Sequence, residues 1–191
     1  MSTLNGAAFA AHVGELVARY RAEIAGPHEH LSLLRWQLSQ GDALDQRTTF
    51  PGHVTTSALV LSRDYQQILM IDHVTIGRWL QPGGHYESAA SLAESAAREA
   101  LEETKVQGLV LHPWHQGGDL PLVIDSHDVP GKASRNEPPH VHHDFQYLFV
   151  ADAEAPLVAQ EDEVHAARWQ ALPTLAELST KAYERIKAII G

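Results

Sequence analysis

Three glutamates in the middle of the chain have the spacing of a divalent-cation site. Glu99, Glu102 and Glu103 stand at positions i, i+3 and i+4, so a helix would present them on one face. Carboxylates at that spacing repel one another, and the helix dipole disfavours them near the end of a helix. A hard cation such as Mg²⁺ or Mn²⁺ would reverse the repulsion, because it takes several oxygen ligands. A solvated acidic surface is the alternative explanation.

The residues around these acids follow a known spacing. The stretch from Gly84 to Val106 resembles the Nudix box, G-x5-E-x7-R-E-U-x-E-E-x-G-U, in which U is a bulky aliphatic residue. The matching positions are Gly84, Arg98, Glu99, Glu102, Glu103 and Val106. The resemblance extends over about 52–180, because "RWLQPGG" leads into the box and "EVHAARWQALPTL" follows near the C-terminus.

The resemblance implies a divalent-metal-dependent hydrolase that cleaves a diphosphate linkage in a nucleoside diphosphate derivative or a similar small phosphoanhydride. Mg²⁺ or Mn²⁺ would neutralise the diphosphate and activate a water for attack on phosphorus. The implied metal ligands are Glu99, Glu102, Glu103 and the carbonyl of Gly83, and the catalytic residues are these glutamates with Arg98. Glu163 is a candidate extra ligand or base, with an ordinary loop acid as the alternative.

The box of this chain is incomplete. The residues that depart from the pattern are Ala90, Ala100 and Lys105. In the family the first glutamate of the box is mainly a structural partner of the box arginine, so its replacement by Ala90 should leave Arg98 to pair with Glu87 or Glu102. Lys105 replaces a glycine at a helix end where φ is often positive, and we expect modest strain or a different helix end there.

A second group of polar residues lies outside the box. In a strand from about 140, a period of two places His140, His142 and Asp144 on one side, which suits a transition metal. "VIDSHD" contributes a second alternating pair, and one histidine follows the box glycines. The candidate substrate-binding residues are His85, Asp125, His127, His140, His142, Asp144 and the cation Arg78.

Three interpretations of these histidines stay open. They could line a substrate cleft, hold a second, histidine-ligated metal ion, or form a solvated surface. A subset of Nudix-like proteins shares "GRWLQPGGH" and a later H-x-H-x-D with this chain, but this resemblance indicates a class of chemistry and names no substrate. No pattern in the sequence singles out His53.

The elements that must position these residues alternate between helices and strands. We expect helices over 4–25, 28–40, 92–104 and from Pro173 to about 190, and strands over 53–62, 66–74, 78–81, 106–112, 119–127, 140–151 and 165–172. Ser91 and Glu94 form a capping box before the central helix.

This pattern predicts an α/β or α+β fold. The resemblance makes it a Nudix-type α/β/α sandwich with a mixed sheet. We divide the chain into an N-terminal helical extension, 1–50, and a hydrolase domain, 51–191.

Composition limits the remaining possibilities. The 191 residues carry a formal net charge of −10, which disfavours nucleic acid and anionic membranes as partners. The absence of cysteine excludes disulfides and thiolate metal sites, and the N-terminus lacks the features of a signal peptide, so we expect a cytoplasmic protein. The expected partner is a small phosphorylated metabolite or nucleotide, and homodimerisation is left open.

Two other functions compete with hydrolysis. A Nudix-like domain could bind a nucleotide or metabolite without turnover, and Ala90 is the feature that supports this. A histidine-ligated β-sandwich metalloprotein resembling a cupin is the other alternative. Its usual order places His-x-His before the PG-x-x-H segment, whereas this chain has the reverse order.

Overall fold

The computed structural model describes residues 3–115, 119–132, 137–160 and 164–191. Its sheet consists of β1 (Gly52–Ser62), β2 (Gln67–His73), β3 (Arg78–Leu80), β4 (Gly83–His85), β5 (Val110–Leu111), β6 (Val123–Val129), β7 (His140–Ala151) and β8 (Val164–Ala171). Its helices are α1 (Gly6–Glu23), α2 (Ser32–Gln40), α3 (Leu92–Thr104) and α4 (Thr180–Ile190), with 3-10 turns η1 (Glu29–Leu31), η2 (Pro113–His115) and η4 (Leu172–Glu177). In the described part of the chain, no helix is long and apolar enough to cross a membrane.

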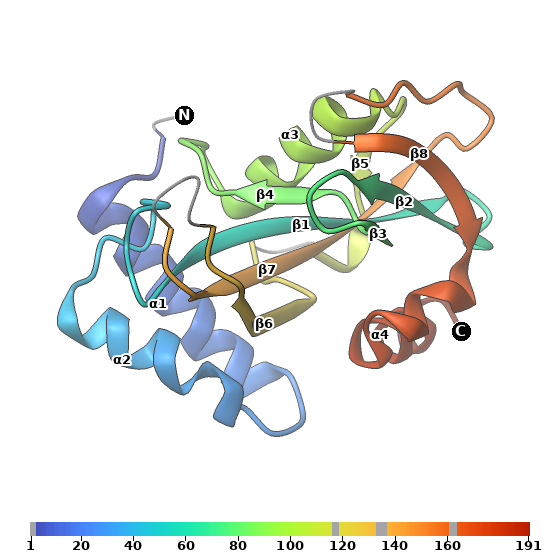
Figure 1. Cartoon of the computed structure of the whole chain (residues 1–191). Helices are drawn as coiled ribbons and strands as arrows, with labels where there is room; N and C mark the ends of the chain where they lie inside the picture. Colours follow the sequence, from blue (N-terminus) through green and yellow to red (C-terminus); the bar gives the residue numbers. More distant parts are fainter. Residues whose placement is uncertain (1–2, 116–118, 133–136, 161–163) are drawn as a thin grey trace.

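The sheet is mixed and is organised around one long parallel pair. β1 pairs with β7 in parallel from Gly52 to Ser62, and the central strand order is β3-β2-β1-β7-β5. The remaining pairs are antiparallel, with β4 on β1, β6 on β7 and β8 on β2. In Figure 1, α3 lies above the β1–β7 pair and α4 lies below it. This is the predicted mixed sheet between helical layers.

The two faces of the sheet carry different cores. On one face, Val54, Ala58 and Val60 of β1 pack in a cluster with apolar residues of α1 and α3. On the opposite face, Leu59 and Leu61 belong to a second cluster with residues of η4 and α4. Alternate residues of one strand therefore serve two separate cores, which explains why β1 is buried along its whole length.

The second face changes from apolar to polar along β1. Before Leu59 the same face carries Ser57, Thr55 and His53, and their partners on β7 are Gln146, Asp144 and His142. Asp125 and His127 of β6 and His85 of β4 extend this row through their pairing. The polar half of the face thus gathers six of the seven candidate substrate-binding residues onto four adjacent strands.

The N-terminal helices pack directly against the sheet. Phe9, Val13 and Leu16 of α1 are buried in the same cluster as the first face of β1. The Phe9 ring lies 4.5 Å from that of Tyr86, and the Tyr86 hydroxyl donates to the Leu4 carbonyl at 2.7 Å. A separate unit at 1–50 stays a prediction, and the structure shows its first helix contributing to the shared core.

Several elements differ from the sequence-based expectation. The glycine pair Gly83-Gly84, which lies outside the strands expected from the sequence, belongs to strand β4 because it pairs with Thr56 and Ser57 of β1. The strand expected over 119–127 lies at Val123–Val129, and the run expected over 106–112 contains only the two-residue β5. The last helix begins at Thr180, since the segment after Pro173 forms 3-10 turns.

Both ends of α3 carry the features expected from its sequence. The Ser91 hydroxyl accepts from the Glu94 N–H at 3.1 Å, and the Glu94 carboxylate reaches back to the Ala90 N–H at 2.6 Å. At the other end, Lys105 has a φ of 51° in the left-handed region, with its N–H bonded to the Leu101 carbonyl. A residue with a Cβ therefore occupies a conformation that favours glycine.

We predict that Lys105→Gly stabilises the fold by about 1 kcal/mol relative to Lys105→Ala, because only glycine removes the Cβ penalty of the left-handed conformation. Chemical denaturation of the two variants measures this difference. Both variants remove the same charge, so equal midpoints would show that the conformation at this position is not strained.

Candidate active site

The carboxylates of α3 lie against the glycines of β4. Glu99 is 8% exposed and Glu103 is 2% exposed, whereas the side chain of Glu102 is about half exposed. A Cβ on Gly84 would lie 2.7 Å from Oε2 of Glu99, and the N–H of Gly83 donates to Oε2 of Glu103 at 3.0 Å. The backbone of β4 therefore lies close to the Glu99 carboxylate, and this approach requires the absence of a side chain at Gly84.

Glu99 has an unusual electrostatic environment. Burial raises its pKa to about 7, although the Arg98 guanidinium opposes the shift. Glu102 adds to the increase because it is a like charge. A divalent cation beside these carboxylates would stabilise their charged forms and offset the burial cost.

Arg98 replaces its missing partner with three other acids. Its guanidinium lies 2.7 Å from Glu99, 2.9 Å from Glu102 and 3.4 Å from Glu87. The expectation that Glu87 or Glu102 would accept Arg98 is confirmed. The Nε of Arg98 is buried and has no hydrogen-bond partner in the structure, and the first box glutamate is replaced by Ala90.

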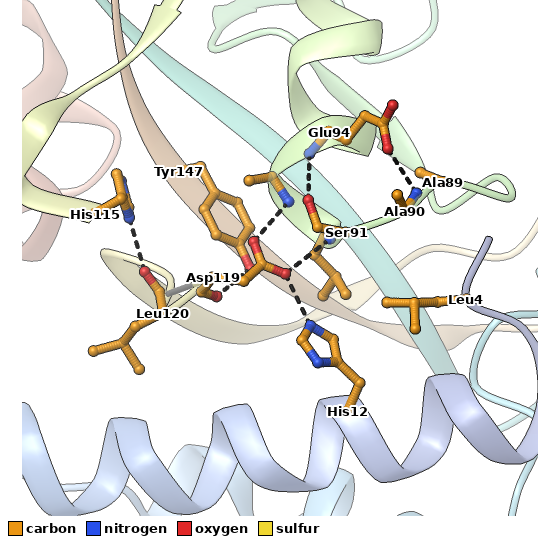
Figure 2. Close-up of polar contacts among 12 residues, drawn as sticks. Leu4, His12, Ala89, Ala90, Ser91, Glu94, His115, Asp119, Leu120 and Tyr147 are labelled. Carbon is orange, nitrogen blue, oxygen red and sulfur yellow. Dashed lines mark hydrogen bonds and ion pairs between the residues drawn. The ribbon is translucent and has the colours of Figure 1, made fainter. Parts of the chain in front are cut away.

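Asp119 holds the start of α3 from a distant loop. Figure 2 shows its carboxylate between α3 and the His12 side chain of α1. It accepts from the backbone N–H groups of Leu92 at 3.1 Å and Ala93 at 3.2 Å, and lies 2.9 Å from Nε2 of His12. These N–H groups belong to the first turn of α3, where no intrahelical acceptor is available. Asp119 therefore positions the helix that carries the glutamates, and no sequence pattern indicates this.

The polar half of the opposite sheet face forms a histidine cluster, which we define as His53, His85, His127, His140 and His142. His142 of β7 pairs with His53 of β1 on one side and with His127 of β6 on the other. His85 of β4 pairs with Thr55, two residues from His53 on the same face. The predicted placement of His140, His142 and Asp144 on one side of β7 is confirmed.

Two histidines of this cluster are held in the neutral form. Burial lowers the pKa of His142 to about 2 and that of His85 to about 4, and neighbouring histidines lower both pKa values further. His127 differs, because its hydrogen bond to Asp125 at 3.0 Å raises its pKa. A cluster that is largely neutral avoids repulsion between adjacent rings.

The other candidate residues have separate surroundings. Asp144 is 3% exposed and accepts hydrogen bonds from Ser57, Thr55 and Gln146. Its carboxylate oxygens are therefore engaged in hydrogen bonds within the sheet. Arg78 is exposed at the start of β3, and its positive charge disfavours protonation of His127. Glu163 lies outside the described residues.

His53 is the residue of this cluster that sequence reasoning missed. Its position is marked by the alternation His53-x-Thr55-x-Ser57, a polar row that precedes the apolar part of the same strand face. The parallel pairing with β7 places it opposite His142, and this pairing is a long-range property of the fold. Residues from β4, β1 and β7 thus meet although the sequence separates them widely.

Comparison with known proteins relates this geometry to a family. The family model described as the NUDIX domain matches residues 51–190. A probable DHNTP pyrophosphohydrolase of Lactococcus lactis subsp. cremoris (strain MG1363) is 31% identical over 107 residues, which cover 56% of this chain and 59% of that protein. Phosphatase NudJ of Escherichia coli (strain K12) is 31% identical over 81 residues, covering 39% of this chain and 52% of NudJ. The chain thus spans between about half and three-fifths of the curated relatives it matches.

The fold is shared with a solved structure of low sequence identity. The crystal structure of a C. elegans Ap4A hydrolase binary complex matches with a TM-score of 0.52 and 13% identity, covering 72% of this chain and 96% of that chain. This likeness shows the α/β/α architecture with a mixed sheet. The cupin-like β-sandwich considered from the sequence is therefore wrong.

We predict that Asp119→Ala lowers the free energy of unfolding by about 1–3 kcal/mol, because two N–H groups of α3 and His12 lose their acceptor. Urea denaturation measures the change. Asp128→Ala, on an exposed residue of β6, is the matched control and should change stability by under about 0.5 kcal/mol. An equal effect of both substitutions would contradict the role of Asp119.

Proposed function

Because the chain belongs to the NUDIX family, we propose that it is a divalent-metal-dependent hydrolase that cleaves a diphosphate linkage in a nucleoside diphosphate derivative or a similar small phosphoanhydride. The observation that carries this proposal is the packing of two buried glutamates, Glu99 and Glu103, against Gly84 and Gly83. Glu102 is on the same helix, one position before Glu103.

The donor set fits Mg²⁺ or Mn²⁺. Carboxylate oxygens from Glu99, Glu102 and Glu103 are the ligands these hard cations prefer. The carbonyl of Gly83 fits a fourth ligand, because the Ala58 N–H bonds to the Pro82 carbonyl and leaves the Gly83 backbone groups on the outer edge of β4. The N–H of Gly83 on this edge already contacts Glu103.

The residues of the site divide into holding and orienting roles. A bound divalent cation would supply charge neutralisation of the diphosphate and a more acidic water. Arg98 holds Glu99 and Glu102 in position through charge-assisted hydrogen bonds and balances their charge. Glu99, buried and with a raised pKa, is the carboxylate suited to orient a water or accept its proton.

The charge of the site and the names of the relatives support the proposed class of substrate. A diphosphate would supply negatively charged oxygen ligands to cations held by the glutamates. The relatives named above carry the names DHNTP pyrophosphohydrolase and phosphatase, which supports a small phosphorylated metabolite or nucleotide. Arg78 and His127, both exposed beside the polar sheet face, would contact the part of the substrate away from the cleaved bond.

Binding without turnover is the competing function. The observations that favour it are the buried Nε of Arg98, which has no hydrogen-bond partner in the structure, and Ala90 in the place of the first box glutamate. The guanidinium nevertheless contacts Glu99, Glu102 and Glu87 through its other nitrogens. These contacts hold Glu99 and Glu102, two of the proposed metal ligands, and this supports the hydrolase.

We predict Mg²⁺- or Mn²⁺-dependent hydrolysis of at least one compound in a panel of nucleoside triphosphates, dinucleoside polyphosphates, nucleotide sugars, ADP-ribose, NADH and dihydroneopterin triphosphate. Chromatographic detection of products measures it. Glu102→Gln and Glu103→Gln should each lower the rate at least about 100-fold, because they remove an anionic ligand.

The matched control for these variants is Glu154→Gln, an exposed acid outside α3, which should keep the full rate. If Glu102→Gln and Glu103→Gln both keep the full rate, the assignment of the site is wrong. Tight binding of a nucleotide with no product in the presence of either metal would favour the non-catalytic alternative.

We also predict that Gly84→Ala lowers the hydrolysis rate and the Mn²⁺ affinity by about 10- to 100-fold with little change in stability. The added Cβ would lie 2.7 Å from the Glu99 carboxylate, a flexible group that can move but would leave its position. Electron paramagnetic resonance of free Mn²⁺ measures the affinity. Gly14→Ala in α1, where a Cβ meets nothing within 4 Å, is the control. Wild-type affinity in Gly84→Ala would contradict the geometry.

A further inference from the structure

We propose that His53, His85 and His142 bind one zinc-class transition-metal ion, at a site separate from the glutamates of α3. One ring nitrogen from each of the three histidines lies within 4.8 Å of the others. The three residues come from the adjacent strands β4, β1 and β7 and share one face of the sheet. Such a three-strand origin gives a rigid site that does not depend on loop conformation.

His53 shows the orientation of a metal ligand. Its ring is 1% exposed, and Nδ1 lies 3.2 Å from the Thr49 carbonyl. That contact fixes the proton on Nδ1 and leaves Nε2 with a free lone pair. Nε2 is buried and has no hydrogen-bond partner in the structure. A buried polar atom without a partner costs free energy, and an ion bound to Nε2 would remove this cost.

His140 of β7 has the same orientation relative to a backbone carbonyl as His53. Nδ1 of His140 lies 2.8 Å from the Pro138 carbonyl, so its Nε2 is also directed away from the backbone. This Nε2 lies 3.2 Å from Nε2 of His142. Two nitrogens bound to one tetrahedral zinc ion lie about 3.3 Å apart, given Zn–N distances of roughly 2.0–2.1 Å. His140 therefore lies beside the three proposed ligands, within hydrogen-bond distance of His142.

The composition of the cluster selects the class of ion. Neutral imidazoles suit Zn²⁺, Cu²⁺, Ni²⁺ and Co²⁺, whereas Mg²⁺ and Ca²⁺ prefer oxygen. The nearest carboxylate on β7, that of Asp144, is already bonded to Ser57 and Gln146. Three histidines with an open fourth position are one of the ligand sets found in catalytic zinc sites.

The geometry of β4 separates this ion from the glutamate site. Gly84 directs its Cα hydrogen side toward Glu99, because a Cβ there would meet that carboxylate. The next residue, His85, points to the opposite face of the strand and contacts His53 and His142 at ring-centroid distances of 5.0 and 5.1 Å. The histidine site is thus independent of the proposed hydrolase activity, and each can fail alone.

The test is calorimetric titration of the full, untagged chain with Zn²⁺ after chelator treatment, in millimolar Mg²⁺ to occupy the carboxylates. One Zn²⁺ per chain should bind with a Kd at or below the micromolar range. Co²⁺ in place of Zn²⁺ should give visible absorption bands of a nitrogen-rich tetrahedral site. His85→Asn and His142→Gln should each weaken Zn²⁺ binding at least 100-fold and remove the bands.

Two controls make this result specific. His165→Gln removes an exposed histidine of β8 and should leave the affinity unchanged. Glu102→Gln with Glu103→Gln should also leave it unchanged, because those carboxylates lie on the other face. Circular dichroism verifies that each variant folds. No Zn²⁺ binding, equal affinity in the folded His85→Asn and wild-type chains, or loss of binding in the glutamate variant would each overturn the proposal.

Discussion

The parallel pairing of β1 with β7 is the constraint on which the other features depend. It runs from Gly52 to Ser62, and it determines which side chains share a face. A shift of one residue would exchange the two faces, so Val54 and Ala58 would leave their core and His53 and Thr55 would enter it. The apolar packing of α1 and α3 on one face and α4 on the other therefore holds the polar row in position.

Local patterns in the sequence predict the parts of the site that one element builds. The spacing of Glu99, Glu102 and Glu103 is a property of α3 itself, and the alternation of His140, His142 and Asp144 is a property of β7. Contacts between elements were predictable only through the family resemblance. His53 and Asp119 illustrate the limit, because their partners lie 89 and 26–107 positions away and depend on strand register and loop path.

The surroundings of Arg98 show which acids contact the box arginine when the first box glutamate is absent. Ala90 cannot accept a hydrogen bond from the arginine, yet three other carboxylates lie within 3.4 Å of it. One of them, Glu87, is an exposed residue of the loop before α3. The charge of the arginine is thus balanced by exposed acids as well as by the buried Glu99, while its Nε has no hydrogen-bond partner in the structure.

The position of α1 has a consequence for folding during synthesis. The buried residues of α1, the contact of its His12 with Asp119, and the hydrogen bond to Ala89 from Leu4, just before the helix, all require partners made much later in the chain. Because α1 precedes all of these partners in the chain, Phe9, Val13 and Leu16 stay unburied until the central strands and the loop at Asp119 have been synthesised. Contacts of such large sequence separation slow folding, and in the waiting period the apolar side of α1 is available to chaperones.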